Sequence, residues 1–127
     1  LPGARQSMME RVYYATREAS DRNAIVLQII GDDSPVRVLP LPQDGTPVYV
    51  SQLVHQSGLG GKLGGLDLTL FRYSTGSVSG LPMECKIDRD ARAVRPETDY
   101  ALHAGDRLQV SEATLSFSTL VNRVLGR

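Results

Sequence analysis

Thiol and imidazole groups can hold metal ions or act as nucleophiles, and this sequence has three of them: Cys85, His55 and His103. Neither histidine has a second ligand at metal-binding spacing, and two histidines with one cysteine make a poor zinc set. Cys85 falls on the apolar side of an alternating segment, residues 82–88, which predicts a buried and unreactive thiol. We therefore expect both histidines to be at the surface or half-buried, and we expect no metal, no cofactor and no catalytic residue.

Two acidic segments offer carboxylate groups. Asp32 and Asp33 are flanked by Gly31 and Pro35, which predicts a turn, and adjacent turn residues seldom converge on one substrate. In residues 88–92 aspartates and arginines interleave, which indicates a solvated loop, because a calcium loop needs more regularly spaced oxygens. An enzyme needs a cleft with convergent titratable groups, and no spacing in the sequence builds one.

The segment GLGGKLGG, residues 58–65, has the composition of a loop that cradles phosphate. It lacks the GxxxxGK[ST] spacing, because Lys62 is followed by Leu63, and it follows a predicted helix instead of preceding one. A flexible connection from a helix to a strand is the preferred interpretation.

Tyrosine rings could stack on sugar rings. With no tryptophan and no pair of tyrosines at strand spacing, packing in the core or at a sheet edge is the preferred interpretation. The tyrosines are Tyr13, Tyr14, Tyr49, Tyr73 and Tyr100.

The composition is that of one globular domain. The 127 residues include 14 basic and 14 acidic side chains, and this zero formal net charge argues against nucleic-acid binding through a basic field. No apolar run approaches the ~20 residues needed to cross a bilayer, and no signal-peptide pattern is present. The single cysteine excludes an internal disulfide. Because the chain starts with Leu1 instead of Met, we expect it to be part of a longer protein.

The N-terminal segment, residues 7–20, places Met8, Met9, Val12 and Tyr13 at helical spacing. A helix is preferred here, although VYYAT has the composition of a strand. We expect this helix to pack against the rest of the domain or against a partner.

Two apolar runs, residues 24–30 and 36–41, with the turn formers GDDSP between them, predict a β-hairpin. Pro40 and Pro42 cannot donate hydrogen bonds to a neighbouring strand. The second strand must therefore end there or lie on an edge of the sheet.

A short helix is predicted over residues 51–57. Ser51 is a good N-cap, and Gly58 is well placed as a left-handed C-cap. An alternative start uses Thr46 as the cap, with Pro47 at the first helical position. One face of this helix is apolar: Val50, Leu53 and Val54.

Alternation of apolar and polar residues predicts three more strands, at residues 66–73, 82–88 and 107–110. Residues 89–99 are polar and indicate a loop. Residues 114–126 are amphipathic at helical spacing. That helix would measure about 18 Å against a hydrocarbon core of about 30 Å, so we expect it to pack on the domain or at a subunit contact.

Runs of strands around one central helix indicate an α+β fold, with the helix packed on a mixed sheet. The order hairpin, helix, strand, strand, short strand is that of the β-grasp, or ubiquitin-like, fold. We divide the chain into an N-terminal helical extension (residues 1–21), a β-grasp domain (22–112) and a C-terminal amphipathic helix (113–127).

The segment YALHAGDRLQVSE, residues 100–112, resembles the closing motif of the SLBB family, the soluble-ligand-binding β-grasp domains, in which a Leu-x-x-Gly-Asp segment leads into the last strand. The matching residues are Leu102, Gly105, Asp106, Leu108 and Val110. The segments PVRVLPL, VYVSQLVHQSGL, LDLTLFR and PMECKID agree with the family in order and spacing, so the resemblance covers roughly residues 24–112. The chain departs from the family where the helix ends in Ser57-Gly58-Leu59 instead of a double glycine.

Gly105 and Asp106 have a role that follows from their chemistry. A glycine permits positive φ and a tight entry into a strand, and an aspartate in such a turn accepts hydrogen bonds from nearby backbone N–H groups. We expect Asp106 to be a structural residue that holds the last strand in register beside the hairpin. Arg107 is expected either to pair with Asp106 or to face solvent.

The resemblance implies a non-enzymatic binding or oligomerisation module. SLBB domains occur in bacterial polysaccharide-export proteins of the outer membrane and in related periplasmic proteins. Their occurrence there implies a periplasmic or outer-membrane location, with polysaccharide, a second copy of the chain or other export components as partners. For self-association, the exposed faces of the terminal helices are the first candidates. For glycan, the candidate residues are Gly58, Gly60, Gly61, Lys62 and Gly64, together with Tyr73, which we expect to lie near them.

The alternative is a ubiquitin-like protein-interaction module unrelated to export. A sulfur carrier of that fold needs a free Gly-Gly tail, and this chain ends Leu125-Gly126-Arg127. The carrier version is therefore disfavoured.

Overall fold

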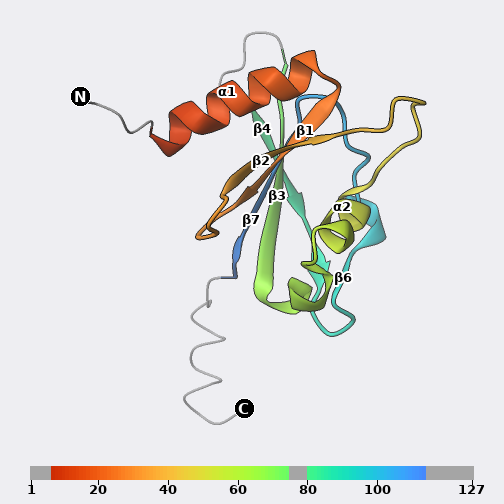
Figure 1. Cartoon of the computed structure of the whole chain (residues 1–127). Coiled ribbons are helices and arrows are strands. Elements are labelled where there is room, and N and C mark those ends of the chain that lie inside the picture. The colour runs from red at the N-terminus through yellow and green to blue at the C-terminus, as the bar shows by residue number, and fades with distance from the viewer. Residues whose placement is uncertain (1–6, 75–79, 114–127) are drawn as a thin grey trace.

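The computed structural model describes residues 7–74 and 80–113. They form a five-stranded mixed sheet with helices on both faces, which confirms the predicted α+β class (Figure 1). The predicted helix at residues 114–126 lies outside the described residues. The elements are α1 (Met8–Asp21), β1 (Ala24–Ile29), β2 (Val36–Pro40), α2 (Val50–Gln56), the 3-10 helix η1 (Gly60–Gly65), β3 (Leu66–Arg72), β4 (Leu81–Cys85), β5 (Ile87–Asp88), β6 (Ala93–Val94), the 3-10 helix η2 (Pro96–Thr98) and β7 (Arg107–Glu112).

The last strand of the chain lies in the middle of the sheet. The strand order is β2-β1-β7-β3-β4, with β7 parallel to β1 and antiparallel to β3. β1 and β2 form the predicted hairpin, in which Val26 faces Val38. Between them the Asp32 carboxylate accepts the Ser34 N–H at 3.1 Å, so Asp32 is the turn residue that the sequence predicted. β2 ends at Pro40 and lies on an edge of the sheet, where a proline is tolerated.

One face of the sheet carries the main core. Alternate residues of β1, β7 and β3 point to this face, which α2 and η1 cover (Figure 1). The predicted apolar face of α2 is buried there: Val50, Leu53 and Val54. Gly58 follows the helix with φ +80°, as its predicted role as a left-handed cap requires.

The start of α2 differs from the prediction. The helix begins at Val50, and Tyr49 is its N-cap, with the Tyr49 N–H donating to Gln52 Oε1 at 2.8 Å. Ser51 is already helical, and its hydroxyl donates to Asp99 Oδ2 at 2.6 Å. The predicted Ser51 cap was wrong because an aspartate 48 residues away binds this serine.

α1 lies across the opposite face of the sheet, over β1 and β2 (Figure 1). The predicted helix is confirmed, and Ser7 caps it by accepting the Glu10 N–H at 3.1 Å. The contact with the sheet is made by Ala15 and Ala19, whose small side chains let the helix come close. Met8 and Val12 of the predicted apolar stripe lie on the same side of the helix as these alanines, but the contact with β1 and β2 does not include them. The residues of the stripe are exposed or half-buried: Met8, Met9, Val12 and Tyr13.

The chain from residue 82 to 99 forms more and shorter elements than predicted. The single strand expected at residues 82–88 is two strands, because β4 ends at Cys85 and β5 pairs with β6. Lys86 is the break, with its N–H bound to Thr98 Oγ1 and its carbonyl to the Arg95 N–H, both at 2.8 Å. The expected loop at residues 89–99 contains β6 and η2, and the glycine-rich connection contains η1.

Candidate functional site

Arg107, the first residue of β7, has its side chain on the α1 face of the sheet. In the pairing of β1 with β7, Arg107 lies beside Val26, which contacts α1. Arg107 is only 9% exposed. Its guanidinium donates to three neutral oxygens: Tyr73 Oη at 3.1 Å, Gln28 Oε1 at 2.6 Å and Gln109 Oε1 at 3.0 Å. It also lies over the Phe71 ring, with 4.0 Å between Cζ and the ring centroid, as a cation–π contact.

No carboxylate neutralises Arg107 within residues 7–74 and 80–113, because the ion pairs there all join other residues. In the same part of the chain its Nη2 atom makes no hydrogen bond. Burial of an ion without a counter-ion costs several kcal/mol. A cation held in this way is suited to bind an anion from outside the domain.

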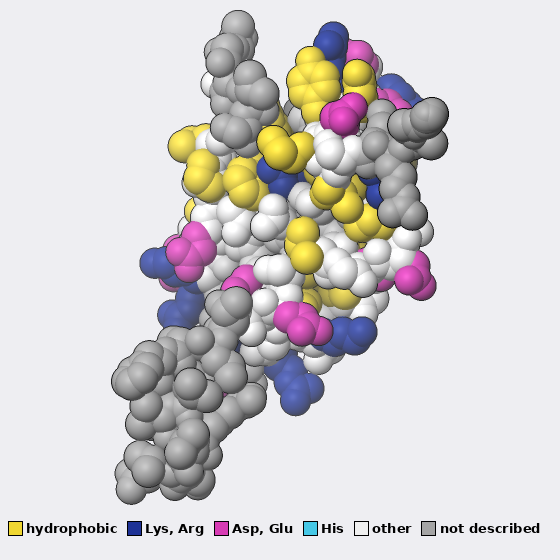
Figure 2. Space-filling model, turned by 90° about the vertical axis from the view of Figure 1, so that its left-hand side faces the viewer, with side chains coloured by type: hydrophobic (Ala, Val, Ile, Leu, Met, Phe, Trp, Pro, Cys, Tyr) yellow, Lys and Arg dark blue, Asp and Glu magenta, His cyan; other side chains and the backbone are white. Residues whose placement is uncertain are grey.

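Arg107 lies on the sheet side of a groove of about 800 Å³ between α1 and β7. The groove exists because α1 rests on β1 and β2 and leaves the α1 face of β7 and β3 open. Its sheet side is polar: Gln28, Tyr73, Arg107 and Gln109. Its helix side is mainly apolar: Met8, Met9, Val12, Tyr13 and Tyr14. Figure 2 shows hydrophobic side chains gathered over the upper part of the molecule, with basic side-chain atoms visible between them.

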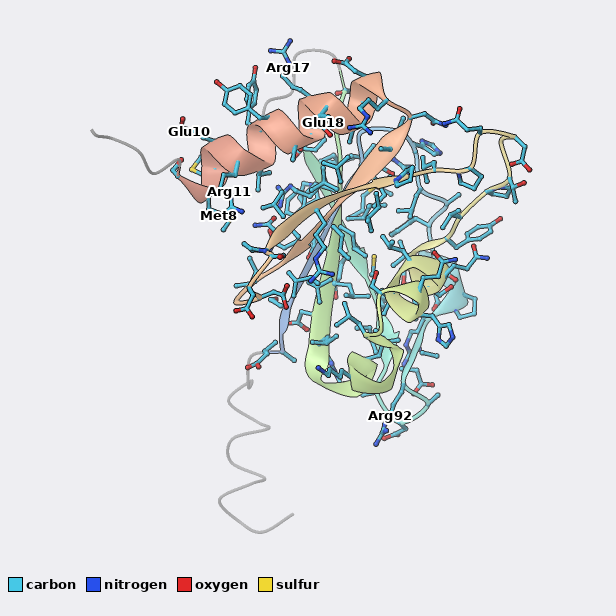
Figure 3. The ribbon with its side chains drawn as sticks, viewed as in Figure 1. Met8, Glu10, Arg11, Arg17, Glu18 and Arg92 are labelled. Atoms are coloured by element: carbon cyan, nitrogen blue, oxygen red, sulfur yellow. The ribbon has the colours of Figure 1, made fainter. Side chains whose placement is uncertain are left out.

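The charged side chains of α1 that line the groove have partners on the helix itself. Glu10 accepts a hydrogen bond from the Ser7 hydroxyl at 3.3 Å. Arg17 projects from α1 away from the sheet (Figure 3) and donates to the Tyr13 hydroxyl at 3.1 Å, which raises the pKa of Arg17. Neither side chain forms an ion pair with Arg107.

Asp106 lies on the other face of the sheet from Arg107, because successive strand residues point to opposite faces. The prediction that Arg107 pairs with Asp106 or faces solvent was therefore wrong. Asp106 is 1% exposed and pairs with Arg72 through two contacts, Nε to Oδ1 at 3.1 Å and Nη2 to Oδ2 at 2.8 Å. This pairing raises the pKa of Arg72. Asp106 also accepts the His103 N–H at 2.8 Å, which confirms its predicted role in the turn.

The Gly105–Asp106 corner ties β7 to β1. Gly105 has φ +87°, as predicted, and its N–H donates to the Ala24 carbonyl at 2.8 Å. The Val26 N–H donates to the Asp106 carbonyl at 2.9 Å. Leu102, the other residue of the predicted motif, is buried in the core. The corner therefore holds the last strand beside the hairpin, as the sequence predicted.

The predicted glycan-binding residues do not form one surface. The glycines and the lysine lie at or before the start of β3, in η1 and just after α2: Gly58, Gly60, Gly61, Lys62 and Gly64. Tyr73 follows the other end of β3, a strand of seven residues that spans roughly 20 Å. The expectation that Tyr73 lies near the glycines was wrong, and Tyr73 lines the groove beneath α1 instead.

The cysteine and the two histidines have the burial that the sequence predicted. Cys85 is 4% exposed, so its predicted burial is confirmed, and this burial raises the pKa of its thiol to about 12. His55 and His103 are exposed. Within the described ranges, no three His, Cys, Asp or Glu side chains are grouped so that they could hold a metal ion.

The tyrosines are less buried than predicted. Tyr13, Tyr14 and Tyr49 are exposed, and only Tyr73 and Tyr100 are half-buried. Tyr13 and Tyr14 stand edge to face, with 5.4 Å between their ring centroids, on the helix side of the groove.

A second hollow, of about 730 Å³, lies beside β3 and β4. Its charged residues include Asp67 and Arg89, which pair with each other at 3.0 Å. Its other charged residues, Glu84, Lys86 and Arg95, are exposed, so this hollow has no buried cation comparable to Arg107, and the groove beneath α1 is the stronger candidate for a binding site.

The sequence did not predict that Gln28, Arg107 and Gln109 belong to one site. A signal was present, because Gln28 interrupts an apolar run and Arg107 and Gln109 alternate with Leu108 and Val110. The pattern identifies residues that share a sheet face, but it does not show that α1 stands over that face.

Comparison of the chain with known protein families, characterised proteins and solved structures found no match. Among the helices of the described residues, none combines the length and the apolar character needed to span a membrane.

Proposed function

We propose that residues 24–112 form a β-grasp domain of the SLBB kind, which acts as a non-enzymatic binding module. The central parallel pair of β1 and β7, with α2 between the hairpin and β3 along the chain, is the arrangement expected of that fold. The corner at Gly105 and Asp106 stands where the closing motif of the family would place it. Both features support the proposal.

In this proposal the groove beneath α1 is the binding site. The observation that carries it is the buried guanidinium of Arg107, which has no counter-ion within the described residues and borders an open groove. The side chains of Gln28, Gln109 and Tyr73 add directional hydrogen-bonding groups on the same side, as in many ligand pockets. The ligand is an envelope polysaccharide or a surface of a partner subunit, and the protein acts in the periplasm or at the outer membrane.

The chemistry of the groove favours binding over catalysis. The polar groups that contact Arg107 are amides and a phenol. These groups are weak acids and bases at neutral pH, so they are poor candidates for proton transfer. The one thiol of the chain, Cys85, is buried in the core on the other face of the sheet.

The test is a titration of the chain with oligosaccharides of bacterial envelope glycans, followed by ¹H–¹⁵N NMR, together with sedimentation at high concentration. We expect shifts of the backbone amides of Gln28, Arg107 and Gln109, or a self-associating species. Shifts confined to Gly60, Gly61 and Lys62 would move the site to η1. A monomer that binds no glycan but captures a folded protein domain would favour the ubiquitin-like interaction module and contradict the link to export.

A further inference from the structure

We infer that the groove beneath α1 binds a ligand that carries a carboxylate next to an apolar body, and that Arg107 pairs with the carboxylate. The inference rests on the proposed use of this groove as the binding site, and it adds the chemical class of the ligand.

The charge of the ligand follows from the surroundings of Arg107. Its three hydrogen-bond acceptors are neutral, so the positive charge is positioned but not compensated. The Nε atom and the Nη1 atom are occupied, and Nη2 remains as the donor without an acceptor among the described residues. One free nitrogen suits a single carboxylate oxygen. Charge-assisted hydrogen bonds of this kind are about twice as strong as neutral ones.

The apolar body follows from the helix side of the groove. Met9 is 83% exposed, Tyr14 56%, Tyr13 43% and Met8 39%, and all four line the groove. Because these four side chains line one groove, they form a contiguous exposed apolar surface, which is typical of a binding site, and methionine adapts well to ligands of different shape. Hydrocarbon placed against these residues would be removed from water while the carboxylate reaches Arg107.

The experiment compares two matched pairs of probes by calorimetry and NMR: octanoate with 1-octanol, and cellobiouronate with cellobiose. The pairs separate a hydrocarbon carboxylate from an acidic sugar. We expect octanoate to bind about tenfold or more tightly than 1-octanol, with shifts at Arg107 and Gln109, and we expect its affinity to fall with added salt.

The decisive variant is Gln109→Glu. It places a carboxylate at the position where Gln109 Oε1 already contacts Arg107 at 3.0 Å, so it neutralises the cation with little change of shape. We expect octanoate binding to fall about tenfold or more. Ser111→Glu is the matched control, because it adds the same charge on the same strand and face, one step farther from Arg107, and it should change the affinity by about twofold or less.

Equal binding of octanoate and 1-octanol, or octanoate binding unaffected by Gln109→Glu, would overturn the inference. If cellobiouronate is the only probe that binds, the inference that the ligand has an apolar body is wrong. If cellobiose binds in the groove and Gln109→Glu has no effect, the proposed function stands and the inference fails. If no probe shifts a groove amide and the protein stays monomeric, the proposed function fails as well.

Discussion

Asp106 and Arg107 are neighbours in the chain, yet their side chains lie on opposite faces of the sheet. Asp106 is bound by Arg72 on the face that carries the main core, and Arg107 lies in the groove beneath α1. One residue thus holds the strand in place, and the charge of the other is not compensated by any carboxylate of the described residues.

The ion pair of Asp106 makes a measurable contribution to stability. Asp106→Asn leaves the Arg72 guanidinium without its counter-ion at a site where the carboxylate is 2% exposed, and we expect the free energy of unfolding to fall by about 3 kcal/mol. Urea denaturation followed by circular dichroism measures this. Asp67→Asn is the control, because its pair with Arg89 is 46% and 48% exposed, and it should cost about 1 kcal/mol or less. Equal losses in the two variants would contradict this account.

Position 105 requires glycine for two reasons, its positive φ and the close approach of Ser20. In Gly105→Ala the new Cβ would lie 3.2 Å from Ser20 Cβ, at a φ of +87° that side chains other than glycine rarely adopt. We expect a loss of about 1 to 3 kcal/mol in the free energy of unfolding. Gly61→Ala meets no atom within 4 Å and has no positive φ, so it should change stability by about 0.5 kcal/mol or less. The prediction fails if the two alanine variants unfold at the same urea concentration.

Cys85 gives the protein a component of stability that depends on pH. Its pKa is about 12 in the folded protein against 9.0 for the free side chain, so the unfolded chain loses the thiol proton first as the pH rises. This component is complete below about pH 9 and is lost at about 1.4 kcal/mol per pH unit between pH 9 and 12. The difference between the wild type and Cys85→Ala, unfolded at a series of pH values, isolates it. If the free energies of unfolding of the wild type and of Cys85→Ala change with pH in the same way from pH 9 to 11, the thiol is not desolvated in the folded protein.

The glycine-rich segment is anchored by one side chain. Leu63 of η1 is 5% exposed and belongs to the main core. Leu63→Ala should therefore lower the free energy of unfolding by about 2 to 5 kcal/mol. The adjacent Lys62→Ala changes only an exposed side chain and should have an effect of about 0.5 kcal/mol or less. If both variants are as stable as the wild type, the segment is the loose connection that its composition suggested.

The sequence was most informative where one periodicity decides the structure. Alternation along residues 66–73 and the turn between residues 30 and 36 depend on neighbouring residues, and both predictions were confirmed. The corner at Gly105 was predicted for the same reason, since backbone conformation and turn hydrogen bonds are local.

The predictions failed where a distant residue decides the structure. The break at Lys86 depends on Thr98, and the start of α2 depends on Asp99 binding Ser51. The sequence predicted that α1 packs on the domain, but not that the contact is made by Ala15 and Ala19, because the residues of β1 and β2 that meet them are distant in the chain. The site at Arg107 joins residues from α1, β1, β3 and β7, whose assembly no single segment encodes.

The central position of β7 has a consequence for biosynthesis. β1 is made early and gains its second neighbour only when residues 107–110 pair with it. Until the ribosome has released this strand, β1 and β3 each present an unpaired edge, and contacts of such high sequence separation form slowly. The sheet is therefore complete only after β7 has been made, and until then both edges are open to pairing with other chains.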